Sequence, residues 1–257
     1  MKILGIYNIK GGVGKTATAV NLAHLAAADG LRTLIWDLDP QAAATFYLRV
    51  KPKVKDSEKV LRGKRDLDAA LKGSDYPGLD LLPADFSYRN MDLLLGETKK
   101  PALQLLRLLR PLSARYDLVV LDCPPSISLV SENIFRAADA LLLPKIPTTL
   151  SLRTLVQLLD FMEGHRLDTP VYAFYSMVDR RKRLHLEVCA SQPDPRCRTL
   201  AATIPYASEV ERMGIERRPV TDYAPRGVAA RAYRALWDEV RAAVGGLRPM
   251  ASFDSPF

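Results

Sequence analysis

Apolar and polar positions follow two different periods along the chain. Short runs rich in β-branched and large apolar residues, such as Asp117–Asp122, are typical of strands buried on both faces. Longer stretches between them, such as Thr149–Gly164, carry apolar residues at the 3.6-residue spacing of helices with one buried side. This alternation predicts an α/β fold of the doubly wound type, a mostly parallel sheet with helices on both faces.

The predicted strands are Lys2–Asn8, Arg32–Asp37, Leu79–Pro83, Asp117–Asp122, Ala140–Lys145, Val171–Met177 and Thr199–Ile204. The predicted helices are Lys15–Asp29, Ser57–Lys72, Ala102–Ala114, Ser128–Ala138, Thr149–Gly164, Leu184–Ser191 and Arg226–Ala243. No internal repeat or low-complexity linker interrupts the series, so we predict a single domain over residues 1–246. Residues 247–257 mix proline, serine and isolated apolar positions without a helical period, which predicts a flexible tail.

Composition excludes two classes of protein. The 257 residues are 48% hydrophobic and 26% charged, which is globular rather than disordered. The longest apolar runs, such as Leu118–Leu121, are too short to cross a bilayer. Lysine and glycines follow the short apolar start of the chain where a signal peptide needs a long apolar region, so we expect a cytoplasmic protein. Cys123, Cys189 and Cys197 are an odd number at unpatterned spacings, which favours reduced thiols over disulfides.

The segment Ile9–Thr16, Ile-Lys-Gly-Gly-Val-Gly-Lys-Thr, lies where the first predicted strand ends and the first predicted helix begins. Its glycines allow a tight turn whose amide groups approach phosphate oxygens, and the helix N-terminus adds positive partial charge. Lys15 then neutralises the β- and γ-phosphates of a nucleotide, and the Thr16 hydroxyl is placed to ligate Mg²⁺. A purely structural turn is the alternative, but the strand-to-helix context argues against it.

The strict phosphate-loop pattern fails at one position, because Ile9 stands where its first glycine belongs. Lys-Gly-Gly-Val-Gly-Lys-Thr instead resembles the deviant Walker A loop of the ParA/MinD family of P-loop ATPases. By that resemblance, the extra signature lysine, Lys10, reaches the phosphates of the other subunit in a nucleotide sandwich dimer. The alternative is an exposed lysine beside an ordinary loop.

Two carboxylates at predicted strand ends agree with this resemblance. Asp-Leu-Asp-Pro-Gln at 37–41 is similar to the family's D-x-D-P-Q switch, which makes Asp39 the residue that positions the attacking water and completes the metal environment. Asp122 ends an all-apolar strand and resembles a Walker B aspartate that holds Mg²⁺ through water. A turn-forming Asp-Pro at Asp39 and a capping aspartate at Asp122 are the structural alternatives. Cys123 is interpreted as a packing residue.

The C-terminal third extends the resemblance from residue 2 to about Val244. Ile204-Pro205-Tyr206 is similar to the family segment that lines the adenine pocket. The family commonly has Asn-Met before the next helix to read the base, whereas this chain has Ser176-Met177, so adenine specificity is less secure than triphosphate binding. The full predicted nucleotide set is Lys10, Gly11, Gly12, Val13, Gly14, Lys15, Thr16, Ala17, Ser176, Met177 and Pro205. Catalytic roles fall to Lys10, Lys15 and Asp39, and metal binding to Thr16, Asp39 and Asp122.

The resemblance implies a function in partition or cargo positioning. ParA-type ATPases bind ATP and Mg²⁺, pair into a homodimer, coat nonspecific double-stranded DNA on the nucleoid, and hydrolyse ATP slowly until a ParB-like or cargo-adaptor partner stimulates release. MinD-like members instead end in a basic amphipathic helix that binds membrane, and the two prolines in 248–257 disfavour that device. A MinD-like positioning ATPase remains the alternative, with a small-molecule kinase as a third class.

Charge is consistent with an anionic partner. The chain carries 37 Lys and Arg against 29 Asp and Glu, a net charge of +8, and eight of those cations lie between Arg49 and Arg65. A basic run is more often a solvated face than a nucleic-acid site. The candidate DNA contacts are Arg217, Arg218, Arg226 and Arg231. For Arg231 and Arg234 the alternative is a solvated helix face, or for Arg234 a salt bridge to Asp238.

His185 and Cys189 share one predicted helix face, as two zinc ligands would. With Cys197 they supply only three potential ligands, separated by a loop with two prolines. Zinc is therefore not favoured.

Overall fold

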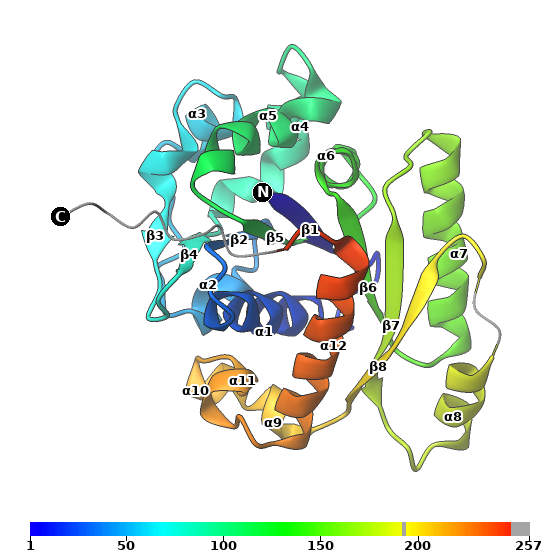
Figure 1. Ribbon diagram of the computed structural model, residues 1–257. Helices are drawn as coiled ribbons and strands as arrows, with labels where there is room; N and C mark the ends of the chain where they lie inside the picture. Colours follow the sequence, from blue (N-terminus) through cyan, green and yellow to red (C-terminus); the bar gives the residue numbers. More distant parts are fainter. Residues whose placement is uncertain (192–193, 248–257) are drawn as a thin grey trace.

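The computed structural model describes residues 1–191 and 194–247. Eight strands form one sheet in the order β3-β4-β2-β5-β1-β6-β7-β8 (Figure 1). All neighbouring strands are parallel except the short β3, which pairs antiparallel with β4. The predicted fold class, a doubly wound and mostly parallel α/β sheet, is confirmed.

The strands lie close to their predicted positions. They are β1 Lys2–Ile6, β2 Thr33–Asp37, β3 Lys72–Gly73, β4 Leu79–Leu82, β5 Leu118–Asp122, β6 Ala140–Lys145, β7 Val171–Val178 and β8 Arg198–Pro205. The central strands are buried along their whole length, as continuous apolar runs require when helices cover both faces. Only β3 was absent from the sequence prediction.

The helices divide between the two faces of the sheet (Figure 1). On one face pack α1 Lys15–Ala28, α2 Ala43–Tyr47, α10 Met213–Glu216, α11 Val220–Tyr223 and α12 Val228–Val244. On the other pack α3 Ser57–Leu61, α4 Met91–Gly96, α5 Gln104–Leu109, α6 Leu129–Ala137 and α7 Thr149–Gly164. The remaining α-helices are α8 Arg183–Ala190 and α9 Ser208–Glu211. Short 3₁₀ turns cover Leu67–Ala70, Phe86–Asn90, Pro101–Leu103 and Arg110–Ala114.

Two predicted helices are wrong in extent. The helix predicted over Ser57–Lys72 ends at Leu61, because Gly63 adopts a positive φ of 70° and the chain turns back on itself. Residues 67–70 then form a 3₁₀ turn and Lys72 begins β3. The helix predicted over Ala102–Ala114 is α-helical only from Gln104 to Leu109, since Pro111 has no amide hydrogen to donate.

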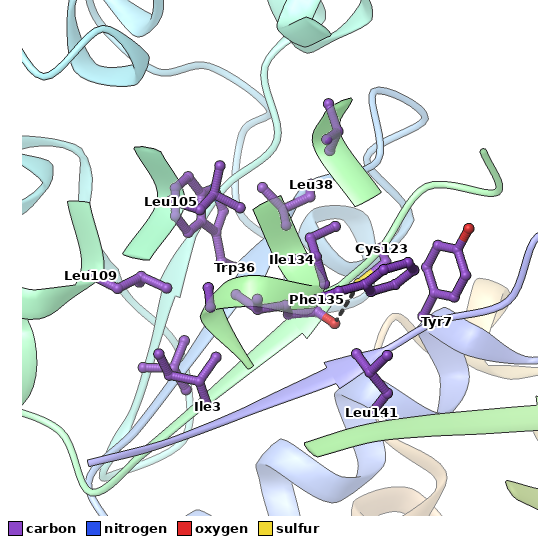
Figure 2. Packing of buried hydrophobic residues seen from close by; sticks show 14 of the residues in the cluster. Ile3, Tyr7, Trp36, Leu38, Leu105, Leu109, Cys123, Ile134, Phe135 and Leu141 are labelled. Atoms are coloured by element: carbon purple, nitrogen blue, oxygen red, sulfur yellow. Dashed lines mark hydrogen bonds between the residues drawn. The ribbon is translucent and has the colours of Figure 1, made fainter. Parts of the chain in front are cut away.

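The larger core cluster joins the sheet to α4–α7 (Figure 2). Tyr7 and Phe135 pack edge to face, with ring centroids 4.7 Å apart. Cys123 is fully buried in this cluster, so its interpretation as a packing residue agrees with its position. On the opposite face Leu247 is buried in the second cluster, although it was predicted to begin the tail, and residues 248–257 lie outside the described residues. Within the described ranges, none of the helices has the length and apolar character needed to cross a membrane.

Candidate functional site

A cavity of about 440 Å³ opens at the carboxyl end of the sheet, where parallel α/β sheets place their ligands. Three segments surround it: the loop after β1, the segment after β2, and the stretch that follows β8. Of the predicted site residues, the following line it: Gly11, Gly12, Gly14, Lys15, Thr16, Ala17, Asp39, Ser176, Met177 and Pro205. The fold therefore brings together residues that lie far apart in the sequence.

The loop after β1 is held in one conformation by Asn8. The side-chain amide of Asn8 donates to the Pro144 carbonyl at 2.8 Å, and its oxygen accepts from the Lys10 amide at 2.9 Å. Gly14 has a φ of 91°, and a Cβ at this position would lie 2.9 Å from the Ser176 hydroxyl oxygen. A larger residue would be strained and would clash, so glycine is required there. Ser176 packs against the loop itself, which its sequence position did not indicate.

Lys15 begins α1 and is only 7% exposed. Its amine donates to the Lys10 carbonyl at 3.1 Å, so the side chain curls back over the loop. Burial lowers the pKa of Lys15, while the nearby carboxylates of Asp122 and Asp39 act in the opposite direction. A cation poised over backbone amides at a helix N-terminus is the arrangement that binds phosphate.

Asp37 and Asp122 lie side by side at the ends of β2 and β5. Asp37 accepts hydrogen bonds from the amide and the hydroxyl of Thr45, at 2.8 and 2.7 Å. Burial nevertheless raises the pKa of Asp37 to about 6. Asp39, two residues further on, reaches the cavity wall and accepts from the Gln41 amide at 2.9 Å.

Asp122 is fully buried, and neither of its carboxylate oxygens has a hydrogen-bond partner within normal geometry among the described residues. Burial and the neighbouring Asp37 raise the pKa of Asp122 well above its ordinary value, while the Thr16 hydroxyl and the Lys15 ammonium lower it. An orphaned buried carboxylate beside a threonine hydroxyl fits Mg²⁺, which takes oxygen ligands and retains water. The residues present therefore suit the metal that the sequence predicted.

Three predicted residues do not line the cavity. Val13 is fully buried and Asp122 lies behind the wall. Lys10 is exposed, and its ammonium forms no hydrogen bond or ion pair with any residue in the described part of the chain.

Sequence reasoning missed part of the cavity wall. Tyr47 of α2, Val210 of α9 and Tyr233 of α12 all line it. Tyr233 lies on the buried face of α12, where its spacing is that of an ordinary core residue. No local sequence signal therefore indicates that it lines the cavity. Tyr47 belongs to a helix that the sequence did not predict.

The four arginines predicted to contact DNA differ in their surroundings. Arg217 donates to the Phe46 carbonyl at 3.1 Å, and its guanidinium lies 4.5 Å from the Phe46 ring centroid. Arg218 forms an ion pair with Asp222 at 2.7 Å. Arg226 and Arg231 are exposed, and Arg231 donates to the Arg226 carbonyl.

The salt bridge of Arg234 to Asp238, which was one alternative considered for this arginine, is not formed among the described residues. Arg234 instead pairs at 2.8 Å with Asp29, which follows α1, because α12 crosses α1 on the same face of the sheet.

Known proteins resemble this chain over nearly its full length. The family model described as an AAA domain matches residues 1–169. The chromosome partitioning protein ParA of Caulobacter vibrioides is 33% identical over 255 residues, which cover 93% of this chain and 94% of ParA. The sporulation initiation inhibitor protein Soj of Bacillus subtilis is 31% identical over 252 residues, which cover 94% of this chain and 98% of Soj.

A solved structure shows the same fold. Cobyrinic acid a,c-diamide synthase from Mycobacterium smegmatis, crystallised with an ATP analog and magnesium, is 28% identical and superposes with a TM-score of 0.79 over 97% of this chain and 98% of its own. Together with the loop geometry and the matches to ParA and Soj, this shows that the chain belongs to the ParA/MinD family of P-loop ATPases.

Proposed function

We propose that this protein is a Mg²⁺-dependent ATPase that switches between a monomer and an ATP-bound sandwich homodimer. The observation that carries the proposal is the cavity, which the phosphate-binding loop and Lys15 line, with the orphaned buried carboxylate of Asp122 behind its wall. The similar synthase was crystallised with an ATP analog and magnesium, which supports the same ligands here.

Each polar side chain at the cavity then has a role that follows from its position. Lys15 neutralises the β- and γ-phosphates, and the loop glycines Gly11, Gly12 and Gly14 admit the phosphate oxygens to the backbone amides. Thr16 and Asp122 would hold Mg²⁺, and the metal would supply charge neutralisation at the phosphates. Asp39 lies on the wall, where a carboxylate can orient an attacking water.

We assign the adenine base of ATP to the apolar end of the cavity. Met177, Pro205 and Val210 line it there, and Ser176 packs against Gly14 near the phosphate end. Because Ser176 is only 2% exposed and sits against the loop, we assign it to loop positioning more than to base reading.

The dimer is proposed from Lys10. Its ammonium has no partner within the described chain, so it is free to reach a phosphate held by a second subunit. Phosphoryl transfer depends largely on charge neutralisation, and a lysine supplied in trans would tie hydrolysis to pairing.

We further propose that the ATP-bound dimer binds nonspecific double-stranded DNA on the nucleoid in the cytoplasm, and that a ParB-like or cargo-adaptor protein stimulates hydrolysis and release. The relatives ParA and Soj support a partition role. Arg226 and Arg231 are the arginines best placed for DNA, because they are exposed, whereas Arg217 and Arg218 are engaged with Phe46 and Asp222.

The DNA proposal is tested by retention on random duplex DNA with ATP and Mg²⁺. Binding should require ATP and weaken steeply as salt rises, since it rests on phosphate contacts. The double variant Arg226→Glu, Arg231→Glu should lose retention and keep nucleotide binding. The matched control, Arg107→Glu with Arg110→Glu, reverses the same charge on the other face and should retain DNA. Equal loss in both double variants would refute this location.

The catalytic roles are tested on the same preparations. Lys15→Ala should abolish nucleotide binding, whereas Asp39→Ala should keep ATP bound without turnover. Phosphate release and nucleotide binding measured side by side separate the two effects. An Asp39→Ala variant with normal turnover would refute the water-positioning role.

A further inference from the structure

Lys145 is a buried cation that the nucleotide site does not use. It ends β6, where it lies in register with Tyr175 of β7, and it is only 2% exposed. Its ammonium lies 4.3 Å from the centroid of the Tyr175 ring. A cation–π contact of this kind offsets only part of the cost of removing an ammonium from water.

No anion in the described part of the chain compensates this charge. Across residues 1–191 and 194–247, Lys145 has no ion-pair partner, and its ammonium donates no hydrogen bond. Asp194 is an acidic residue that lines the same cavity as Lys145, but its carboxylate is paired with Arg196 at 2.9 Å.

Two thiols near Lys145 do not supply the missing charge either. Burial raises the pKa of both Cys189 and Cys197, so at neutral pH both remain protonated. Burial also lowers the pKa of Lys145 itself, as expected for an ammonium without a counter-ion.

Lys145 faces a cavity of about 330 Å³ between the sheet and α7. Leu152, Leu155 and Val156 of α7 form an apolar wall, and Tyr175 lies beside the lysine. This volume is at the lower end of the range for small-molecule sites. No lining residue is shared with the nucleotide cavity, so the two are separate places in the fold.

We propose that this cavity binds a small carboxylate with a short apolar tail, its carboxylate paired with Lys145 and its tail against α7. A phosphate group fits less well, because phosphate sites gather several donors and Lys145 is the one cation that lines this cavity within the described chain. The site thus matches a compact organic monoanion.

The test measures hexanoate binding to the full chain by ligand-observed NMR and by the shift in unfolding temperature. Hexanamide serves as the uncharged probe of the same shape. The wild type should bind hexanoate saturably and raise its unfolding temperature, with no comparable response to hexanamide. Lys145→Met should lower hexanoate affinity by about tenfold or more, because it removes a charged hydrogen bond. The control Lys182→Met removes an exposed lysine that does not line the cavity and should bind like the wild type.

A second variant keeps the test decisive if Lys145→Met folds poorly. Val156→Phe fills the cavity from a partly exposed position while it leaves Lys145 in place, and it should also lose hexanoate binding. The proposal is overturned if the wild type shows no saturable hexanoate binding, if hexanamide binds equally well, or if Val156→Phe binds hexanoate as the wild type does.

Discussion

At the scale of single residues, Asp122 is the side chain that most directly indicates a cation site. Its carboxylate is buried without a hydrogen-bond partner among the described residues, so in the metal-free protein it destabilises the fold. We therefore predict that Asp122→Asn raises the free energy of unfolding by about 1–3 kcal/mol without Mg²⁺, and removes the stabilisation that Mg²⁺ and ATP add to the wild type. Urea unfolding with chelator, and then with Mg²⁺ and ATP, measures both effects.

Asp37→Ala is the comparison variant for that experiment. The Asp37 carboxylate accepts two hydrogen bonds from Thr45, and alanine leaves the Thr45 amide and hydroxyl without that acceptor, so this replacement should lower the metal-free stability. If Asp122→Asn destabilises the metal-free protein as Asp37→Ala does, the carboxylate of Asp122 is structural and the magnesium assignment fails.

Some site residues could be predicted from the sequence and others could not, because they reach the site in different ways. Lys15, Asp39 and Asp122 lie at strand ends or helix starts, and the carboxyl edge of a parallel sheet brings such positions together. Tyr47 and Tyr233 reach the cavity only through tertiary packing, which no local pattern encodes.

At the scale of elements, Asp117 joins the starts of β2 and β5. It accepts hydrogen bonds from the Arg32 backbone amide at 2.8 Å and from the Arg32 guanidinium at 3.0 Å. Burial alone would raise the pKa of Asp117, but the hydrogen bonds from Arg32 outweigh it and hold the pKa below its usual range. The fold therefore favours the ionised carboxylate, and this stabilisation is present above about pH 4 and lost as the pH falls.

We predict that Asp117→Asn lowers the free energy of unfolding by about 1 kcal/mol at neutral pH, a modest value because Arg32 is partly exposed. The difference from the wild type should shrink as the pH falls below about 4. Urea unfolding across a pH series measures it. A difference that stays constant across the series would contradict the titration of this carboxylate.

Helices α1 and α12 are connected through Asp29. Arg234 and the Trp237 indole both donate to its carboxylate at 2.8 Å, and the carboxylate is mostly buried. Asp29→Ala should lower the unfolding free energy by about 1–3 kcal/mol, because the Trp237 indole loses its partner. Asp238→Ala, at an exposed position one turn along α12 from Arg234, should change it by less than about 0.5 kcal/mol. Thermal or urea unfolding of the two variants tests whether Arg234 pairs with Asp29. Equal losses of unfolding free energy in both variants would contradict that pairing.

Element boundaries were predicted well where long periodic segments cross the sheet, as in α7, and poorly in the connections. Gly63 and Pro111 are local signals that mark the two misjudged helices, since a glycine ends a helix and a proline interrupts one. The short helices α9–α11 span four residues each, which is too few for a period to be seen.

At the scale of the whole molecule, the fold class was predictable because alternating buried strands and helices admit few arrangements besides a doubly wound sheet. Dimerisation of two molecules is not predictable in the same way, because the proposal for it rests on one exposed side chain, that of Lys10. The account depends on Lys10 reaching a phosphate in a second subunit.

Sedimentation velocity with an unhydrolysed ATP analogue and Mg²⁺ tests that claim most directly. The wild type should sediment as a dimer only when the analogue is present, and so should Lys51→Ala, which removes an exposed lysine away from the loop. Lys10→Ala should bind the analogue and remain a monomer. A Lys10→Ala protein that dimerises with the analogue as readily as the wild type would contradict the account.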